Sequence, residues 1–462
     1  MDALKKERKQ LEEAASRLIS EARRAGADSA EVCASFGHRN KIALEKQDYH
    51  LASSDEGYQL GLRILTGHKQ GFASTNSIES NDLKQVALRA VEIGKLSPEN
   101  PFFTIQSSPP EKTHPPVALW DSALSNTSLQ TQKDWIEWMR QEFLKDSRIR
   151  LNEGSLEVGK SLSLLVNSKG THQLEAETSC TWSLMGMALD KDLLTSFDYF
   201  SHLSRKALGV GDIIIKSTSR FRDSLLKNLR IGEGRSYKGL VFFSPRAVLD
   251  VLLDSLTYHL NGRVLLDGSS RWKLEDKEKP LLNSQLTLID TAWLSDRFSC
   301  GLFDREGTPT EELELLYRGH LKNFLLDNYS GKGLHQSSNG HAVGSATSTP
   351  TVGTHSLCLR GGDKSLQMLM RESDPTSQGI LWINRYSGQT DPVTGDFSGV
   401  AKGSEWWVNG EFRYCVTETL ISGNVFDCLG RHLIGLSSET QVIDSSGESP
   451  SALVDGVSVT TV

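Results

Sequence analysis

The stretch 244-SPRAVLDVLLDSLTYHLNG-262 predicts one buried helix over residues 245–261. Ser244 can cap its N-terminus, and Pro245 suits the first helical position, where no amide hydrogen is needed. Gly262 suits the left-handed residue that follows many helix C-termini. One apolar stripe runs along the helix at spacings of three and four residues, formed by Leu249, Leu253, Leu256 and Leu260. We therefore expect this helix to lie in a core.

Composition restricts the class of protein around this helix. A chain of 462 residues is too long for one ordinary core, so we expect two or three domains. The net charge of −7 and the absence of long Lys or Arg runs argue against nucleic-acid binding. No apolar stretch approaches the ~20 residues of a membrane span, and the charged start MDALKKERKQ is unlike a signal peptide. Six cysteines without paired spacing favour reduced thiols in a cytoplasmic protein.

The first half of the chain alternates helical and strand-like patterns. Tight-turn signals at residues 66–69 and 167–170 predict β-hairpins. A Pro- and Ser-rich connector over residues 98–116 separates two parts, 1–98 and 117–232, of an expected N-terminal α+β domain, 1–232. The expected helices are 2–25, 81–96, 129–145 and 211–228, and the expected strands are 30–36, 42–45, 57–65, 70–74, 148–159, 161–167, 172–189 and 194–203.

The second half, residues 233–462, is predicted to be a β-rich domain. Strand 239–243 leads into helix 245–261, and about 200 residues of short strand patterns and Gly-rich turns follow, with one further helix near 424–434. The predicted fold class is therefore α+β: an N-terminal helix plus an antiparallel sheet, then a sandwich-like or barrel-like C-terminal domain.

Six segments, in order along the chain, resemble those of the TldD/PmbA family, also called the modulator of DNA gyrase family. The N-terminal one is GYQLGLRILTGHKQGFASTN, and the most distinctive C-terminal one is GLFDREGTPT. The six segments cover residues 57–76, 301–310, 317–325, 337–340, 394–398 and 450–459. The resemblance spans nearly the whole chain.

The resemblance places the chain in the PmbA/TldE-like branch of that family. TldD-like members carry a His-Glu-x-x-x-His motif on the first helix of the C-terminal half and a Cys near the C-terminus, which together bind zinc. Here Asp254 and Ser255 stand at the first two motif positions, His259 stands at the last, and residues 444–450 contain no Cys. The resemblance therefore implies no catalytic residue and no metal in this chain.

What the resemblance implies about function is a subunit role. The chain would be the non-catalytic half of a cytoplasmic TldD/TldE-type zinc metallopeptidase acting in proteolysis or peptide maturation. Its partner would be a TldD-like catalytic subunit that holds the zinc, or a second copy of the chain, and its substrate an extended or unfolded peptide. Two alternatives stay open: a stand-alone metallopeptidase with unidentified ligands, and a homodimeric peptide-binding module without activity.

Other polar residues have local interpretations. Asp254 and His259 lie five residues apart, so on a helix they diverge by roughly 140°. His259 is expected to have its hydrogen bonds satisfied at a helix C-terminus, where positive charge is favourable. Asp304 and Glu306 would point the same way in a strand and could then form a general acid/base pair, but turn and hydrogen-bonding roles in Asp-x-Glu-Gly are favoured. His335 and His341 are expected in a solvated turn. The family-like positions without an assigned role are Asp304, Glu306, Gly307, Thr394, Gly395, Asp396, Phe397 and Ser398.

Overall fold

The computed structural model describes residues 4–107, 117–374, 377–417 and 419–461. Most of the expected Pro- and Ser-rich connector, residues 108–116, lies outside the described residues. Of the described helices, none is both long and apolar enough to cross a membrane.

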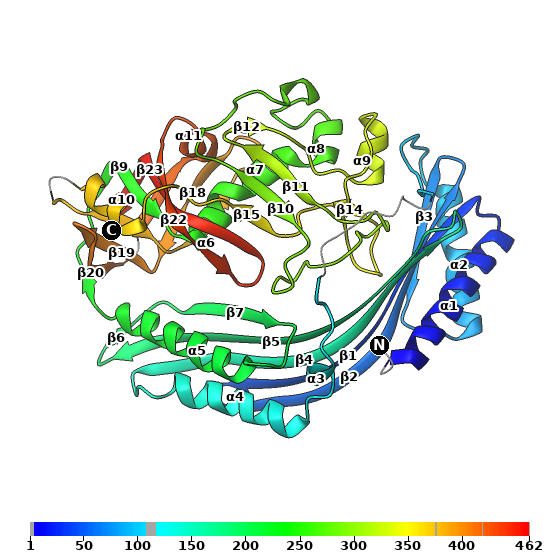
Figure 1. Ribbon diagram of the computed structural model, residues 1–462, viewed down its shortest axis with the longest axis horizontal. Coiled ribbons are helices and arrows are strands. Elements are labelled where there is room, and N and C mark those ends of the chain that lie inside the picture. The colour runs from blue at the N-terminus through cyan, green and yellow to red at the C-terminus, as the bar shows by residue number, and fades with distance from the viewer. Residues whose placement is uncertain (1–3, 108–116, 375–376, 418, 462) are drawn as a thin grey trace.

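A seven-stranded antiparallel sheet forms the N-terminal half, with the order β3-β2-β1-β4-β5-β6 and with β7 also paired to β5. Because β1 pairs with β4 along its length, the segments before and after the connector share one sheet. Figure 1 shows this sheet curving beneath and beside the C-terminal half. Its strands are β1 (Ser29–Glu45), β2 (Asp48–Thr66), β3 (Lys69–Thr75), β4 (Ile149–Asn167), β5 (His172–Asp190), β6 (Leu193–Leu194) and β7 (Asp198–Ser204).

Several of these strands are longer than the sequence predicted. Residues 30–36 and 42–45 belong to the single strand β1, and residues 148–159 and 161–167 belong to the single strand β4. The prediction of separate strands was wrong because the apolar alternation lapses in the middle of each strand, whereas the hydrogen-bonded ladder continues from Gly37 through Lys41. Both predicted hairpins, at 66–69 and 167–170, are confirmed.

Helices cover this sheet at its two ends. Near one end α1 and α2 pack their apolar faces on β1 to β3, and near the other α4 and α5 pack with β4 and β5. Each pair encloses its own apolar cluster, so the long sheet carries two cores. The helices of this half are α1 (Lys5–Arg24), α2 (Ser80–Leu96), α3 (Ser122–Ser125), α4 (Leu129–Phe143) and α5 (Val210–Lys227).

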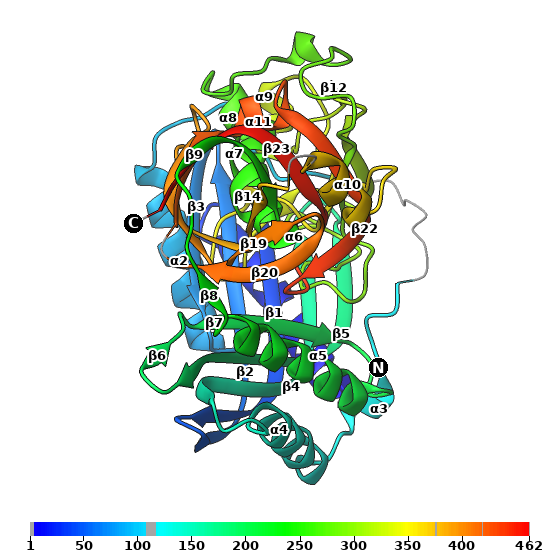
Figure 2. The same ribbon diagram turned by 90° about the vertical axis from the view of Figure 1, so that its left-hand side faces the viewer.

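A 14-stranded sheet organises the C-terminal half and curves around the central helix α7 (Figure 2). The predicted α+β class, with a β-rich C-terminal region, is confirmed. The strands of this sheet are β8 (Ile231–Gly232), β9 (Tyr237–Phe243), β10 (Leu288–Thr291), β11 (Glu312–Tyr317), β12 (His320–Leu321), β15 (Leu357–Leu359), β16 (Ile380–Ile383), β17 (Arg385–Thr390), β18 (Asp396–Lys402), β19 (Ser404–Val408), β20 (Glu411–Val416), β21 (Thr419–Asn424), β22 (Leu433–Ile443) and β23 (Gly447–Thr461).

A separate two-stranded hairpin and several short helices complete this half. The hairpin joins β13 (Ala342–Val343) to β14 (Thr351–Val352). The helices are α6 (Pro245–Ala247), α7 (Leu253–Leu260), α8 (Gly262–Leu266), α9 (Asn328–Gly333), α10 (Leu366–Ser373) and α11 (Val425–Leu429), with a 3₁₀ turn at Leu274–Asp276. The expected helix 424–434 is thus shorter, because the chain turns at Gly430 before entering β22.

The expected continuous helix over residues 245–261 is interrupted. A π-helical turn, Val248–Leu252, separates α6 from α7. Ser244 caps the start as predicted, accepting a hydrogen bond from the Ala247 amide at 3.1 Å. The prediction for Gly262 was wrong: this residue begins α8, and a Cβ there would lie 2.4 Å from Leu326 Cδ2. Close packing, and not a left-handed backbone, explains the glycine.

Candidate functional site

Of the three family-like positions on α7, Ser255 and His259 form side-chain hydrogen bonds to backbone groups, and Asp254 does not among the described residues. Asp254 is exposed, whereas Ser255 is buried and its Oγ donates to the carbonyl of Asp391 at 3.2 Å. His259 is fully buried. Its Nε2 donates to the Val393 carbonyl at 3.1 Å, and its Nδ1 accepts from the Arg271 amide at 3.0 Å. Both ring nitrogens are therefore occupied, as in a neutral histidine.

Burial decides the charge of His259. Removal from water is the main cause that lowers its pKa, and the nearby Arg271 acts in the same direction. The expectation of satisfied hydrogen bonds is confirmed, but the expectation that His259 benefits from positive charge was wrong. Desolvation of an imidazolium outweighs the favourable field of the helix end.

The turn at residues 391–393, whose carbonyls accept hydrogen bonds from α7, leads directly into the family-like segment 394–398. Asp391 organises this turn, since its Oδ1 accepts from the amides of Val393 and Thr394 at 2.8 and 3.1 Å. Gly395 has φ +80°, and a Cβ there would lie 2.6 Å from the ring of Phe426. Asp396 and Ser398 are exposed on β18, and Phe397 is buried. The fold thus brings segment 394–398 beside α7, where its turn has a packing role.

Asp304, Glu306 and Gly307 form a tight turn and not a strand. Asp304 is buried and accepts hydrogen bonds from the amides of Glu306, Thr308 and Ala342 at 2.9 to 3.0 Å. Burial is the main cause that raises the pKa of Asp304 to about 8. Gly307 has φ +79°, and a Cβ there would lie 2.5 Å from Leu165 of the N-terminal sheet. These contacts place Asp304 in the turn and hydrogen-bonding role that the sequence favoured over an acid/base pair on a strand.

Glu306 belongs to a buried charge network that joins the two halves of the molecule. Arg63 on β2 contacts Glu31 at 2.8 Å and Glu306 at 3.0 Å, and Arg305 contacts Glu31 at 3.2 Å. Burial opposes ionisation of Glu31, but the two arginines outweigh it and lower its pKa. Burial raises the pKa of Glu306 to about 7. The network contains two acids and two arginines, all at most 6% exposed.

A second polar cluster lies inside the C-terminal half. Asp290 and His341 are fully buried, with His341 Nε2 at 3.0 Å from Asp290 Oδ2. His355 is half-buried, and its amide donates to the same Oδ2 at 2.8 Å. One donor atom from each of Asp290, His341 and His355 lies within 4.8 Å of the others, an arrangement that could hold a metal ion. His341 was expected in a solvated turn, which was wrong, while His335 is exposed.

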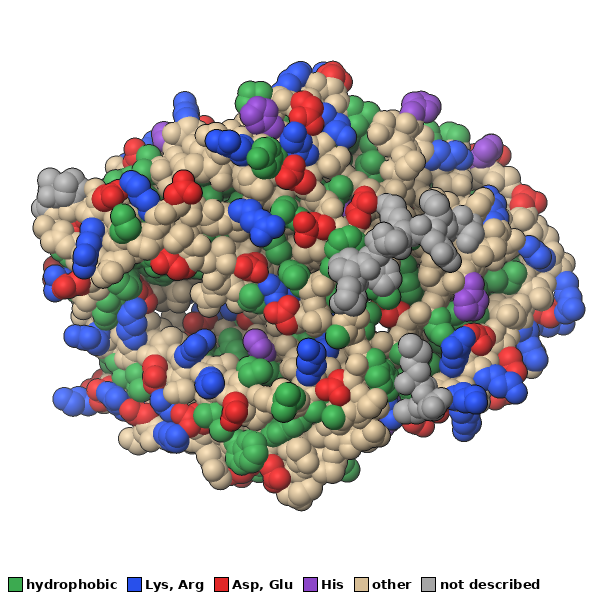
Figure 3. Space-filling view, viewed as in Figure 1, with side chains coloured by type: hydrophobic (Ala, Val, Ile, Leu, Met, Phe, Trp, Pro, Cys, Tyr) green, Lys and Arg blue, Asp and Glu red, His purple; other side chains and the backbone are tan. Residues whose placement is uncertain are grey.

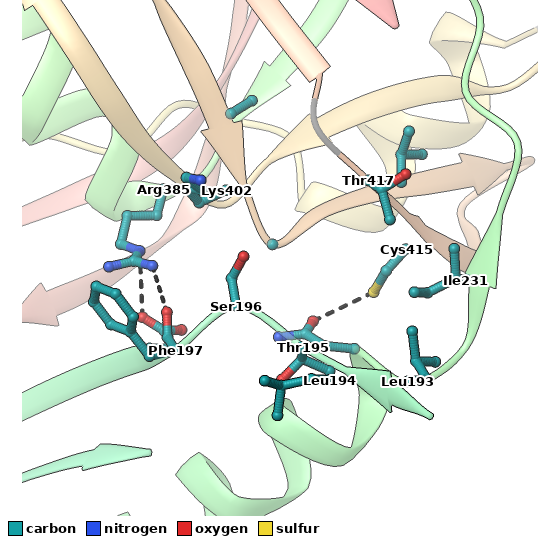
Figure 4. Close-up of a pocket in the computed structure, with 15 residues that line it drawn as sticks. Leu193, Leu194, Thr195, Ser196, Phe197, Ile231, Arg385, Lys402, Cys415 and Thr417 are labelled. Atoms are coloured by element: carbon teal, nitrogen blue, oxygen red, sulfur yellow. Dashed lines mark hydrogen bonds and ion pairs between the residues drawn. The ribbon is translucent and has the colours of Figure 1, made fainter. Parts of the chain in front are cut away.

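A pocket opens where the loop before β7 faces the ends of β17, β18 and β20 (Figure 4). Arg385 points at Phe197, whose carbonyl accepts from Nη2 at 2.7 Å. Cys415 Sγ donates to Asn228 at 3.3 Å, and burial raises the pKa of this thiol to about 12, so it is not a nucleophile at neutral pH. Figure 3 shows the surface hollowed between the two halves on the left of the view.

Comparison with known proteins identifies the family. Residues 236–461 match the domain described as the PmbA/TldA metallopeptidase C-terminal domain, and residues 30–94 match domain 1 of the same group. Together the two matches cover more than half of the chain. The chain belongs to the PmbA/TldD metallopeptidase family.

Relatives within the PmbA/TldD family align over most of their length. The metalloprotease PmbA homolog of Haemophilus influenzae is 25% identical over 446 residues, covering 92% of this chain and 91% of that one. Metalloprotease PmbA of Escherichia coli O157:H7 is 23% identical over 454 residues, covering 94% and 93%. These alignments run through both halves of the chain.

Solved structures share the fold. TldE from Thermococcus kodakarensis superposes with a TM-score of 0.84 at 19% identity, covering 96% of this chain and 99% of that one. A Thermotoga maritima protein, solved as a candidate modulator of DNA gyrase, has a TM-score of 0.81 at 20% identity, covering 97% and 100%.

The metal implied by the PmbA/TldD family name does not fit the residues on α7. A zinc ligand needs a free lone pair, yet both nitrogens of His259 bond to backbone groups. Asp254 is exposed, and the hydroxyl of Ser255 donates to the Asp391 carbonyl. We derive no catalytic step through a metal at this position.

Sequence reasoning missed most of the buried polar residues. Glu31, Arg63 and Arg305 are far apart in sequence, and no spacing motif links them. His341 and His355 likewise lie 51 and 65 positions after Asp290 in the sequence. The one sequence signal was that Arg63, Arg305 and His341 lie within or next to family-like segments.

Proposed function

We propose that this chain is the non-catalytic, PmbA/TldE-like subunit of a zinc metallopeptidase complex. The catalytic zinc and the general base would belong to a TldD-like partner, and the substrate would be an extended or unfolded peptide cleaved in the cytoplasm. The observation that carries the proposal is the state of α7: His259 is enclosed with both ring nitrogens bonded, beside Ser255 where the family's catalytic branch has glutamate.

The relatives support this assignment at the level of the family. The PmbA proteins are described as metalloproteases, and the T. kodakarensis structure is TldE. A chain of this family without usable ligands at the motif position can contribute to peptide cleavage by completing a substrate chamber. The hollow between the two halves (Figure 3) offers a surface for that purpose.

The test is reconstitution with a TldD-like protein from the same source. We expect no cleavage of an unfolded peptide by this chain alone, and chelator-sensitive cleavage by the mixture. Replacing the glutamate of the partner's motif should abolish cleavage. Ser255→Ala in this chain should leave the activity of the mixture within about twofold, because the buried Ser255 hydroxyl donates to the backbone carbonyl of Asp391 and so has a packing role.

Cleavage by this chain alone would contradict the subunit assignment. If such cleavage were also lost in His355→Gln, the chain would be a stand-alone metallopeptidase that uses the Asp290 cluster. Peptide binding without cleavage, both alone and in the mixture, would instead indicate a binding module.

A further inference from the structure

We propose that Asp290, His341 and His355 form a binding site for a divalent transition-metal ion of the zinc type, and that the ion fastens the base of the β13–β14 hairpin. The site lies apart from the family's motif position on α7. The proposal does not depend on which subunit carries the catalytic zinc. Three steps carry it: the proton positions on the two histidines, the unpartnered carboxylate oxygen, and the place of the cluster in the fold.

The proton on His341 is fixed at Nδ1. That nitrogen lies 3.0 Å from the Asn339 carbonyl and 2.9 Å from Asn339 Oδ1. The amide of Asn339 cannot be reversed, because its Nδ2 donates to Phe324 and its Oδ1 accepts from the Leu326 amide. Both neighbours of Nδ1 are acceptors, so Nδ1 must donate. In a neutral His341 the lone pair is then on Nε2, facing Asp290 Oδ2 at 3.0 Å.

His355 is fixed in the opposite tautomer. Its Nε2 lies 2.7 Å from the Gly340 carbonyl and therefore donates, which leaves the lone pair on Nδ1. No described residue hydrogen-bonds to that Nδ1. In metal sites a ligating histidine commonly donates its other N–H to a backbone carbonyl, which fixes the ring and its tautomer. Both His341 and His355 have this support.

Asp290 supplies an oxygen that has no partner. Its Oδ2 accepts from the His355 amide, but its Oδ1 is buried and without a hydrogen-bond partner among the described residues. Leaving the buried Oδ1 unsatisfied is costly. The other oxygen, Oδ2, faces the Nε2 lone pair of a neutral His341 at 3.0 Å, which adds repulsion. A cation bound between the carboxylate and the two ring nitrogens removes both problems.

The donor set specifies the class of ion. Two imidazoles and one carboxylate suit zinc and neighbouring transition metals, whereas calcium and magnesium prefer oxygen ligands. Ligands on tetrahedral zinc lie roughly 3.3 Å apart, given bonds of about 2.0–2.2 Å. The 3.0 Å between His341 Nε2 and Asp290 Oδ2 is close to that spacing, and one ligand atom from each of the three residues lies within 4.8 Å of the others. His355 is half-buried and gives the ion access.

The position of the cluster suggests a structural role for the ion. His341 precedes β13 and His355 follows β14, so the two ligands stand at the two feet of one hairpin, and Asp290 on β10 anchors both. The other end of the hairpin rests on the N-terminal sheet, where a Cβ on Gly61 would lie 1.8 Å from the Ala346 carbonyl. Arg305 of the charge network donates to the carbonyls of Ser345 and Ser348 in the same loop. An ion that fixes His341 and His355 at the base of the hairpin would therefore stabilise the contact between the hairpin turn and the N-terminal sheet.

The experiment uses the untagged full chain after removal of metal with a chelator. We expect Co²⁺ titration to give visible absorption typical of a tetrahedral site, saturating near one ion per chain, with Zn²⁺ displacing it. Zn²⁺ should also raise the Tm and slow hydrogen exchange of the amides in residues 342–356. His355→Gln keeps a donor for the Gly340 carbonyl but removes the imidazole nitrogen that would bind the ion, so it should weaken binding by more than about 100-fold.

Matched variants separate the site from other metal contacts. Asp290→Asn should behave like His355→Gln, whereas His335→Gln, on the exposed part of the same loop, should bind Co²⁺ like the unaltered chain. Absence of cobalt absorption in the unaltered chain would overturn the proposal and leave His341 and Asp290 as an ion pair. Equal binding by His355→Gln would also overturn it. If the variants fail to fold, the spectrum of the unaltered chain decides.

Discussion

His259 lies enclosed at the end of α7 with one ring nitrogen donating and the other accepting. Protonation would place a second N–H against the Arg271 amide, a donor facing a donor. Burial adds a desolvation cost for the charged imidazolium. These effects keep the pKa of His259 in the folded chain below 6.5, the ordinary value for histidine. The side chain therefore works as a neutral connector between α7 and the turn at Asp391 to Gly395.

The linked pH dependence has a definite sign. As the pH falls through about 6.5 the unfolded chain binds a proton at His259 before the folded chain does, so stability present above that pH is lost. Burial lowers the pKa of His202 and His355 as well, and these act in the same direction. Burial acts in the opposite direction on the carboxyl groups of Asp304 and Glu306, whose raised pKa values of about 8 and about 7 add stability as the pH falls. The prediction therefore concerns the difference between two chains: from pH 7.5 to 5.5, the free energy of unfolding of the unaltered chain should fall relative to that of His259→Gln.

Urea denaturation at the two pH values measures this effect. Gln keeps a donor for the Val393 carbonyl but does not titrate, so the difference in slope reports the histidine itself. His68→Gln, at an exposed turn, is the control and should leave the slope unchanged. An unchanged slope in His259→Gln would show that the histidine has the same pKa in the folded and unfolded chains, which contradicts the prediction.

At the scale of elements, the β13–β14 hairpin depends on a glycine in another part of the chain. Gly61 on β2 is buried beneath residue Ala346, and no side chain fits there because a Cβ would lie 1.8 Å from a backbone oxygen. We expect Gly61→Ala to lower the free energy of unfolding by about 1–3 kcal/mol, the usual cost of overpacking. The hairpin must shift away from the sheet to accept the methyl group.

The same strand offers a matched control for this prediction. Gly57 is exposed, and a Cβ there would have nothing within 4 Å. Gly57→Ala should change stability by no more than about 0.5 kcal/mol. Equal effects of the two substitutions in urea denaturation would mean that the hairpin does not rest on β2 in solution.

At the scale of the whole molecule, the charge network connects β1 and β2 to the turn at residues 304–308. Removing one member leaves its partners charged and buried, which typically costs about 3–5 kcal/mol. We therefore expect Arg63→Ala, which leaves Glu31 and Glu306 without their shared arginine, to destabilise the chain by that amount. Thermal and urea denaturation would measure it.

Arg39 is the control for this prediction. It lies on β1 of the same sheet, its side chain is 61% exposed, and its ion pair with Glu157 is long, at 3.8 Å. Arg39→Ala should cost no more than about 0.5 kcal/mol, because exposed ion pairs contribute little. Similar losses in both variants would show that the network does not hold the two halves together.

The sequence by itself determined the local elements and the class of fold. The helices α1, α2, α4 and α5, both hairpin turns and the β-rich C-terminal half follow from apolar periodicity and turn residues, which are properties of neighbouring positions. The family-like segments likewise identified the family. The residues Asp254, Ser255 and His259 can be read directly from the chain, and their assignment to the motif positions of the family remains a prediction from the resemblance.

Only the tertiary structure decided how distant residues meet. The π turn in the central helix, the unbroken strands β1 and β4, and the reason for glycine at positions 61 and 262 depend on packing partners far away in sequence. The same holds for the charge network and for the cluster of Asp290, His341 and His355. Charge state and ligand capacity depend on burial and on fixed hydrogen-bond partners, and these exist only once the two halves have folded against each other.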